Sequence, residues 1–325
     1  MRLGRLQIIN LNFVTHCDSQ YLSRAAILRE SIQEKSDSCN FILVCHDEIT
    51  FKAASLLGIP ESNMILLDRI VERYKELKNA RDNRTHIEFL FCLTPFIMRY
   101  VLDILDLNEI VYIDADEFIL GNPENLFIDA SNVSIAISSH NFLPKLHYLN
   151  KFGKYNVGVI FARKSQDSLA VLNWWSKKCL ESTSISKQDI GVFGDQKYLD
   201  EFQVIYPNTY IYNDKGINSA PWNCTDVCIK QGLFYRDHGD LQLVTFHFSG
   251  LRYNKHIYIA GYNRYGVKLQ KSVKKYLYKD YVKKLIEVDS KIGNLKYKRF
   301  SLRELVRGFL FLDIGLILIQ RKRSN

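Results

Sequence analysis

Two aspartates separated by one residue follow a short apolar stretch near the middle of the chain. Asp114 and Asp116 come directly after residues 110–113, which show no polar alternation and therefore predict a strand buried on both faces. Side chains two residues apart on an extended chain point to the same side. Carboxylates at the end of such a strand are typical ligands of Mg²⁺ or Mn²⁺, together with substrate phosphates. The alternative is a pair of solvated loop acids, and the buried strand favours the metal site over that alternative.

A histidine far downstream could complete this site. His247 lies in the apolar stretch 243–248, and Gly250, Arg252 and Lys255 follow it. Imidazole suits transition metals, and Mn²⁺ accepts mixed oxygen and nitrogen ligands. A glycine lets the backbone approach a phosphate, and neighbouring cations could neutralise one. The alternative, which this segment alone favours, is a core histidine on a strand followed by a chance basic turn.

Strands that alternate with helices are expected to position these side chains. The apolar runs that predict strands are 6–14, 41–45, 64–67, 110–113, 133–138, 157–162 and 243–248. The segments with helical periodicity are about 21–34, 52–57, 71–105 and 169–180. Within 71–105 we expect a break at 79–85 and a kink or restart at Pro95. The alternation predicts a parallel, doubly wound α/β sheet whose ligands lie at the carboxyl ends of the strands.

The composition is that of a folded protein. The chain has 325 residues, of which 47% are hydrophobic and 24% charged, which excludes a disordered or collagen-like chain. Its seven cysteines are odd in number and scattered, and the first residues lack the pattern of a signal peptide. We therefore expect reduced thiols and a cytoplasmic location. Cys224 and Cys228 have no second ligand pair at a suitable spacing, which argues against a zinc site.

The net charge of +9 is concentrated near the C-terminus. Residues 264–325 carry a net charge of +12 and the rest of the chain −3. We therefore predict a catalytic domain over 1–262 and a basic, partly amphipathic helical tail over 263–325. Within this tail, Ser301 and Glu304 resemble a capping box that opens a second helix, and the apolar run 308–319 is shorter than the ~20 residues that span a bilayer.

The tail predicts contact with the anionic cytoplasmic face of a membrane, through its lysines and its apolar positions. The alternatives are that it packs on the catalytic domain or pairs two subunits as a homo-oligomer. Nucleic acid is not expected, because the apolar run would have no use there.

Taken together, these segments resemble the GT-A type glycosyltransferases, in particular the retaining family 8 enzymes and their bacterial relatives in lipopolysaccharide and polysaccharide synthesis. The resemblance covers about residues 6–258. Five stretches match in order, namely 13–21, 112–116 with its continuation 120–127, 155–161, 194–197 and 247–250.

The resemblance implies a role for individual residues. Asp18 would bond the nucleobase and Tyr21 would stack on it, while Asp195 and Gln196 would lie beside the anomeric carbon as the catalytic pair. Asp114, Asp116 and His247 would hold Mn²⁺ or Mg²⁺. Either Arg252 or Lys255 would bind the diphosphate. The other donor-binding positions are Thr15, Arg84, Ala115, Asn156, Gly158 and Gly250.

Two departures from the family pattern concern positively charged residues. Lys197 stands where the family has a second aspartate after Asp195 and Gln196. The spacing from His247 to the diphosphate-binding lysine is stretched, since Lys255 lies eight residues further on. This stretching leaves Arg252 as an alternative.

The activity implied by the resemblance is metal-dependent transfer of a sugar from a nucleotide-diphosphate sugar, with UDP as the expected nucleotide. The acceptor would be a glycan or glycolipid, the enzyme of the hexosyltransferase class, and the anomeric configuration retained. A nucleotidylyltransferase would need a glycine-rich loop after the first strand, and residues 15–20 contain no glycine. An aspartate-nucleophile phosphatase disagrees with Glu117-Phe118 after the aspartates. A catalytically inactive fold that binds glycans or partners is the remaining alternative, and the three candidate metal ligands argue against it.

Overall fold

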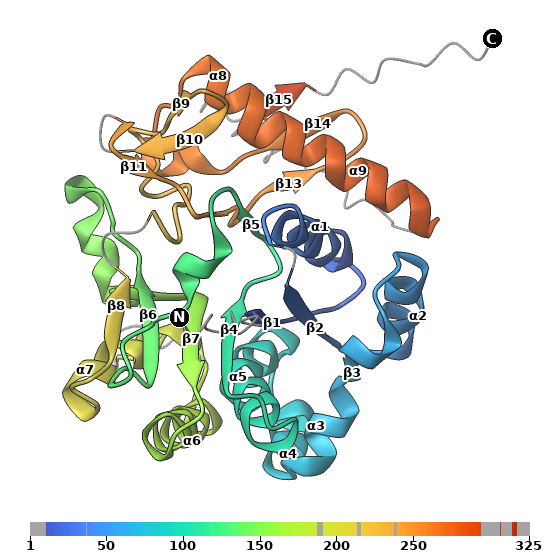
Figure 1. The fold of residues 1–325 in the computed structure, drawn as a ribbon, viewed down its shortest axis with the longest axis vertical. Coiled ribbons are helices and arrows are strands. Elements are labelled where there is room, and N and C mark those ends of the chain that lie inside the picture. The colour runs from blue at the N-terminus through green and yellow to red at the C-terminus, as the bar shows by residue number, and fades with distance from the viewer. Residues whose placement is uncertain are drawn as a thin grey trace, which may run out of the picture.

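A seven-stranded sheet forms the centre of the molecule (Figure 1). The computed structural model describes residues 11–36, 38–186, 191–212, 216–236, 239–293, 306 and 314–316. The strands lie in the order β3-β2-β1-β4-β7-β6-β8. Their bounds are β1 (Leu11–Cys17), β2 (Cys39–Cys45), β3 (Met64–Leu66), β4 (Glu109–Ile113), β6 (Ile135–Ser139), β7 (Tyr155–Arg163) and β8 (Tyr210–Tyr212).

One strand runs against the others. β1 pairs in parallel with β2 and β4, and β2 with β3, as the sequence predicts. β7, however, is antiparallel to both β4 and β6, so the expectation of an entirely parallel sheet is wrong at this strand. Parallel neighbours need a long crossover, usually an α-helix, and the connection from β6 to β7 contains only the short 3-10 segment Pro144–Phe152.

Helices cover both faces of the sheet (Figure 1). Alternate residues of the central strands separate into two buried clusters: Val14 and Tyr112 face α3 to α6, whereas Phe13 and Val111 face α1. The helices are α1 (Leu22–Gln33), α2 (Glu48–Leu56), α3 (Leu67–Arg73), α4 (Glu76–Asn83), α5 (His86–Arg99), α6 (Gln166–Glu181) and α7 (Phe202–Ile205). The 3-10 segments are Glu61–Asn63, Pro123–Leu126, Pro144–Phe152, Gln196–Glu201 and Tyr262–Tyr265.

Helix α5 does not restart at Pro95, and the alternative that the sequence predicts there, a kink, stays a prediction. Helix α5 begins at a capping box formed by Thr85 and Glu88, continues through Pro95 to Arg99, and passes into a π-helical turn at Tyr100–Ile104. The break in the predicted helical stretch lies before this box, between α4 and α5. A proline inside a helix costs about 3 kcal/mol, and the complete burial of neighbours such as Leu93 and Phe96 offsets that cost.

Three smaller sheets lie beside the main one, the third of them in the C-terminal region. The first pairs β5 (Glu117–Ile119) with β12 (Thr245–His247) in antiparallel register. The second contains β9 (Cys228–Lys230), β10 (Leu233–Arg236) and β11 (Leu241–Gln242). The pairing of β5 with β12 matters for function, because it joins the Asp114–Asp116 segment to a strand more than a hundred residues further along the chain.

The basic C-terminal region packs against the rest of the molecule. It contains α8 (Lys271–Val273), the π-helical segment Lys274–Lys279 and α9 (Asp280–Ile292), and α9 runs alongside α1 (Figure 1). Tyr278 and Leu285 share one buried cluster with Ile27 of α1 and Phe246 of β12. The helical tail is therefore confirmed over 271–292, and a boundary at residue 262 stays a prediction.

The second helix expected in the tail is helical at Val306, but it is wrong at residues 314–316. Ile314–Leu316, part of the apolar run 308–319, form strand β15. This strand pairs with β14 (Ile257–Ile259), which in turn pairs with β13 (Arg252–Tyr253). The expected capping box at Ser301 and Glu304 lies outside the described residues. None of the described helices combines enough length and apolar character to cross a bilayer.

Candidate active site

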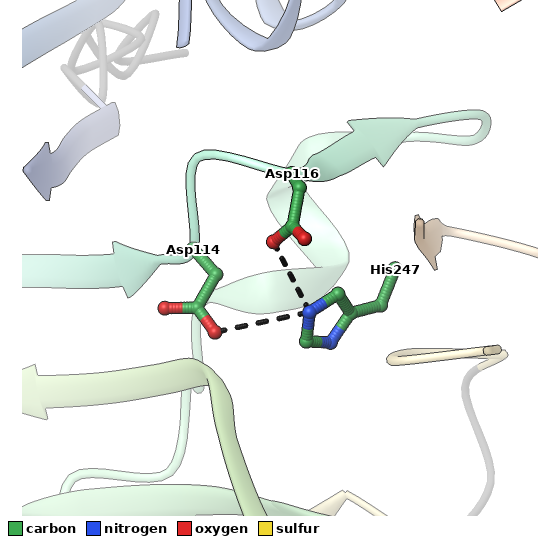
Figure 2. Close-up of side chains that lie close together, drawn as sticks. All are labelled: Asp114, Asp116 and His247. Carbon is green, nitrogen blue, oxygen red and sulfur yellow. Dashed lines mark ion pairs between the residues drawn. The ribbon is translucent and has the colours of Figure 1, made fainter. Parts of the chain in front are cut away.

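The three predicted metal ligands lie together at the carboxyl end of β4. Asp114 and Asp116 follow this strand, and the pairing of β12 with β5 brings His247 opposite them (Figure 2). Nε2 of His247 is 3.1 Å from Oδ1 of Asp116 and 3.9 Å from Oδ2 of Asp114. One ligand atom from each residue fits within 4.8 Å of the others. Both aspartates point toward the same ring nitrogen, so one cation could contact all three side chains.

The charges of this group fit a divalent cation. Burial acts to lower the pKa of His247, but the surrounding carboxylates outweigh burial and raise it to about 10. Burial raises the pKa of Asp114. Burial has the same tendency at Asp116, but attraction to His247 prevails and lowers its pKa. Negative charge therefore converges on Nε2 of His247, where Mn²⁺ or Mg²⁺ would find two hard oxygens and an imidazole.

Gly158 lies directly beneath these ligands. A Cβ atom on Gly158 would be 2.6 Å from Oδ1 of Asn156, 2.9 Å from Nδ1 of His247 and 3.0 Å from Oε1 of Glu117. Its carbonyl accepts a hydrogen bond from the backbone N–H of Asp114 at 2.9 Å. Any side chain here would collide with Asn156, His247 and Glu117, which explains the glycine at this position of β7.

A cavity of about 670 Å³ opens beside the three ligands. It lies at the carboxyl ends of β1, β2 and β4, and the first turns of α5 form another wall. The predicted site residues that line it are Asp18, Tyr21, Asp114, Ala115, Asp116, Asn156, Asp195, Gln196 and His247. Nine positions from all five predicted sequence stretches thus surround one space large enough for a ligand.

Asp195 and Gln196 are held at the edge of this cavity. The Thr94 hydroxyl donates to Oδ2 of Asp195 at 3.3 Å, and Nε1 of Trp175 donates to the Asp195 carbonyl at 3.0 Å. Burial, with Asp114 as a further cause, raises the pKa of Asp195 to about 8. Nε2 of Gln196 donates to the Phe152 carbonyl at 2.9 Å. Both side chains are therefore fixed by neighbours before any substrate binds.

Arg84 lies outside the lining of this cavity. Its guanidinium donates to Oγ1 of Thr183 at 2.8 Å and to the carbonyl oxygens of Cys179 and Leu180. These bonds tie the start of α5 to the end of α6 and occupy its donors. Arg84 is absent from the described lining of the cavity, so the structure does not bring it to the predicted donor site.

Several other predicted residues also lie outside the cavity lining. Thr15 is buried within β1, and Gly250 forms the turn after β12 with φ of +73°. Arg252 begins β13, and Lys255 follows that strand. No lysine or arginine occurs among the described residues that line the cavity.

Lys197 stands where the family pattern has an aspartate. It does not line the cavity. Its Nζ atom forms an ion pair with Oδ2 of Asp200 at 2.7 Å.

The sequence reasoning missed a histidine pair in the cavity wall. Nδ1 of His16, at the end of β1, lies 2.8 Å from Nε2 of His46, just after β2, and the rings stack with centroids 5.1 Å apart. Burial lowers the pKa of both imidazoles, that of His46 to about 4. Because β1 and β2 are parallel neighbours, their ends meet at one edge of the sheet, and that rule applied to both strands would have found the pair.

Comparisons with known proteins identify the fold. No family model matches the chain. The uncharacterised protein YfnF of Bacillus subtilis (strain 168) is 26% identical over 242 residues, covering 71% of this chain and 78% of YfnF. The uncharacterised protein YfnD of the same organism is 24% identical over 245 residues, covering 74% and 77%.

Solved glycosyltransferases share the architecture. The galactosyltransferase LgtC in complex with donor and acceptor sugar analogs superposes with a TM-score of 0.51 at 12% identity, over 82% of this chain and 100% of LgtC. Mouse xyloside xylosyltransferase 1 gives 0.50 at 12% identity, over 74% and 98%. The chain has the GT-A glycosyltransferase fold, as the sequence predicts. Membership of family 8 stays a prediction.

Proposed function

We propose that this protein is a metal-dependent glycosyltransferase that uses a nucleotide-diphosphate sugar. The observation that carries the proposal is the convergence of Asp114, Asp116 and His247 at the mouth of a cavity in a GT-A fold. A module that only binds glycans has no need for this convergence of charge, which is costly to bury.

Asp114, Asp116 and His247 would hold Mn²⁺ or Mg²⁺. The cation would neutralise the diphosphate as it leaves, which is the main electrostatic contribution such a site makes. Asp18 and Tyr21 bind the nucleobase, and UDP is the nucleotide in our proposal. The support for this assignment is that both residues line the cavity that contains the metal ligands.

Asp195 and Gln196 act at the sugar in our proposal. Both line the cavity, and Asp195 is held by Thr94 and Trp175. They orient the sugar and stabilise positive charge at the anomeric carbon, with retention of configuration. Arg252 or Lys255 approaches the diphosphate once the donor is bound.

The acceptor is a glycan or glycolipid, reached at the cytoplasmic face of a membrane. The support for a sugar acceptor is that LgtC, which shares the fold, binds donor and acceptor sugar analogs. The support for membrane contact is the lysine-rich segment 268–291. The apolar residues of this segment, such as Val273 and Leu285, are buried inside the molecule, which leaves the lysine ammonium groups for that contact.

A thermal-shift panel of nucleotide sugars with and without Mn²⁺ tests the proposal. A ligand that binds only the folded protein raises its apparent stability, by about 2.7 kcal/mol at a hundred times its Kd. We expect a UDP-sugar to raise the Tm only when Mn²⁺ is present. A Tm that no nucleotide sugar changes in either condition contradicts the proposal.

A further inference from the structure

A fourth acidic residue lies directly behind the three proposed metal ligands. Glu117 opens strand β5 and is the residue that faces His247 in the pairing of β5 with β12. Its Oε1 atom is 3.5 Å from Nδ1 of His247, whereas Nε2 of the same ring faces Asp116. The imidazole is thus flanked by a carboxylate on each of its two nitrogens.

The burial of Glu117 has few compensating contacts. Its side chain has no exposed surface, and neither carboxylate oxygen makes a hydrogen bond of ordinary geometry with the residues that the structure describes. An acid in such a place is costly. Among the described residues, His247 is the ion-pair partner of Glu117.

Close packing keeps Glu117 against the ring. The space at Gly158 is bounded by Oε1 of Glu117, Nδ1 of His247 and Oδ1 of Asn156. It is too narrow for even one added carbon atom. The register of β5 with β12 fixes the backbones of both residues. The carboxylate therefore stays beside Nδ1 whether or not a cation occupies the other side of the ring.

We infer that Glu117 is a positioning residue for the metal site: its carboxyl group lies beside Nδ1 of His247 and thereby helps to direct the Nε2 lone pair toward the cation. A metal-binding histidine characteristically donates its other N–H to a carboxylate or carbonyl, which fixes the tautomer and increases the basicity of the ligand. This inference rests on the proposed metal site.

Asn218 is the competing partner of the same nitrogen. Its Oδ1 atom is 3.3 Å from Nδ1 of His247. An amide oxygen can fix the tautomer but carries no charge. Glu117→Gln keeps the shape of the side chain and an acceptor oxygen, so this variant separates the contribution of the carboxyl group from that of packing.

The test measures Mn²⁺ binding to the full-length protein by electron paramagnetic resonance of free Mn²⁺, with MnCl₂ as the only added ligand. We expect Glu117→Gln to weaken Mn²⁺ binding about 10- to 100-fold while the Tm of the metal-free protein is unchanged or higher. Asp289→Asn is the matched control, because Asp289 is also a buried carboxylate and bonds Ser23 and Tyr253 instead. This control should bind Mn²⁺ as the wild type does.

A rescue variant separates positioning from a merely structural role. Asn218→Asp restores a carboxylate near Nδ1, and its backbone φ of +57° is one that aspartate tolerates. In the Glu117→Gln background we expect Asn218→Asp to recover part of the lost Mn²⁺ affinity. Introduced alone, it should tighten Mn²⁺ binding, and this measurement does not depend on Glu117→Gln being able to fold.

Wild-type Mn²⁺ affinity in Glu117→Gln, or no effect of Asn218→Asp on affinity in either background, overturns the inference. If Asp114→Asn and Asp116→Asn lose Mn²⁺ binding while Glu117→Gln keeps it, the metal site stands and only the role of Glu117 is wrong. If the wild type binds no Mn²⁺, the proposed metal site itself fails, and the inference with it.

Discussion

At the scale of single residues, the side chains of the cavity are held by bonds that exist before any ligand arrives. Oδ1 of Asp18 accepts the backbone N–H groups of Gln20 and Tyr21 at 2.9 and 3.2 Å. The guanidinium of Arg24 lies 4.5 Å from the centre of the Tyr21 ring. The proposed base pocket is thus built from a turn that Asp18 itself stabilises.

We expect Tyr21→Ala and Asp18→Asn to raise the KM for the donor more than they lower kcat. Contacts with the base are equal in the ground and transition states, so their loss weakens binding without slowing the chemical step. Asparagine keeps an acceptor for the turn, which alanine would not. Steady-state kinetics with Tyr276→Ala as an exposed-tyrosine control measures this. An unchanged KM in both variants excludes this loop as the base site.

The histidine pair predicts a pH dependence of stability. The pKa of His46 is about 4 in the folded protein, below its ordinary value of about 6.5, so the unfolded chain binds more protons between these values. This contribution to stability is therefore fully present above pH 6.5 and is lost as the pH falls toward 4. The loss amounts to about 3 kcal/mol at most. Urea unfolding at pH 7.0 and 4.5 should show a smaller decrease for His46→Gln than for the wild type, and equal decreases would contradict this origin.

At the scale of secondary-structure elements, the sequence predicted what local pattern determines. The unbroken apolar runs at 41–45 and 110–113 became β2 and β4, and the periodicity of 21–34 became α1. The partner of each strand and the direction in which it runs depend on contacts between distant segments. No local signal showed that β7 would reverse, that buried neighbours would keep α5 continuous through Pro95, or that 314–316 would pair with β14.

For the candidate site as well, the sequence predicted what local spacing determines and missed what contacts between distant segments determine. The spacing of Asp114 and Asp116 predicted a metal site, and the structure brings both residues close to His247; their role as metal ligands stays a proposal. Glu117 was missed because its importance comes from the register of β5 with β12. The resemblance predicted that Arg84 binds the donor. The sequence gives no indication that its guanidinium donates instead to acceptors at the end of α6.

Substitution of Arg84 tests whether this residue binds the donor or stabilises the fold. We expect Arg84→Ala to lower the free energy of unfolding by about 1–3 kcal/mol, because the carbonyl oxygens at the end of α6 would lose a charged donor. The KM for the donor should not change. Arg81→Ala is the control, since its partner Asp68 is 70% exposed, and such surface pairs contribute about 0–1 kcal/mol. A raised KM with unchanged stability would return Arg84 to the donor site.

At the scale of the whole molecule, the charge is uneven while the packing is continuous. The C-terminal helices bury Tyr278 and Leu285 against α1 and β12, so removing them would expose the core as well as remove the lysines. Membrane contact is better tested by substitutions on the surface.

We expect Lys268→Gln, Lys271→Gln and Lys275→Gln together to weaken binding to anionic vesicles. All three lysines are exposed, and each contributes about 1 kcal/mol at an anionic surface, so the loss should be on the order of 100-fold. The control variant replaces Lys52, Lys75 and Lys78, which are also exposed, with glutamine. Its net charge changes by the same amount. Co-sedimentation with phosphatidylserine vesicles measures both, and equal binding of the two variants, or no binding by the wild type, contradicts a membrane role for this segment.

Mn²⁺-dependent release of the nucleoside diphosphate from a UDP-sugar tests the central claim most directly. Asp114→Asn and Asp116→Asn keep the shape of the ligands but remove the charge that a hard cation needs. We predict that the wild type releases UDP only with Mn²⁺ or Mg²⁺ and that each variant, folded by circular dichroism, loses this activity. Full activity in both variants would contradict the assignment of Asp114, Asp116 and His247 as the metal site.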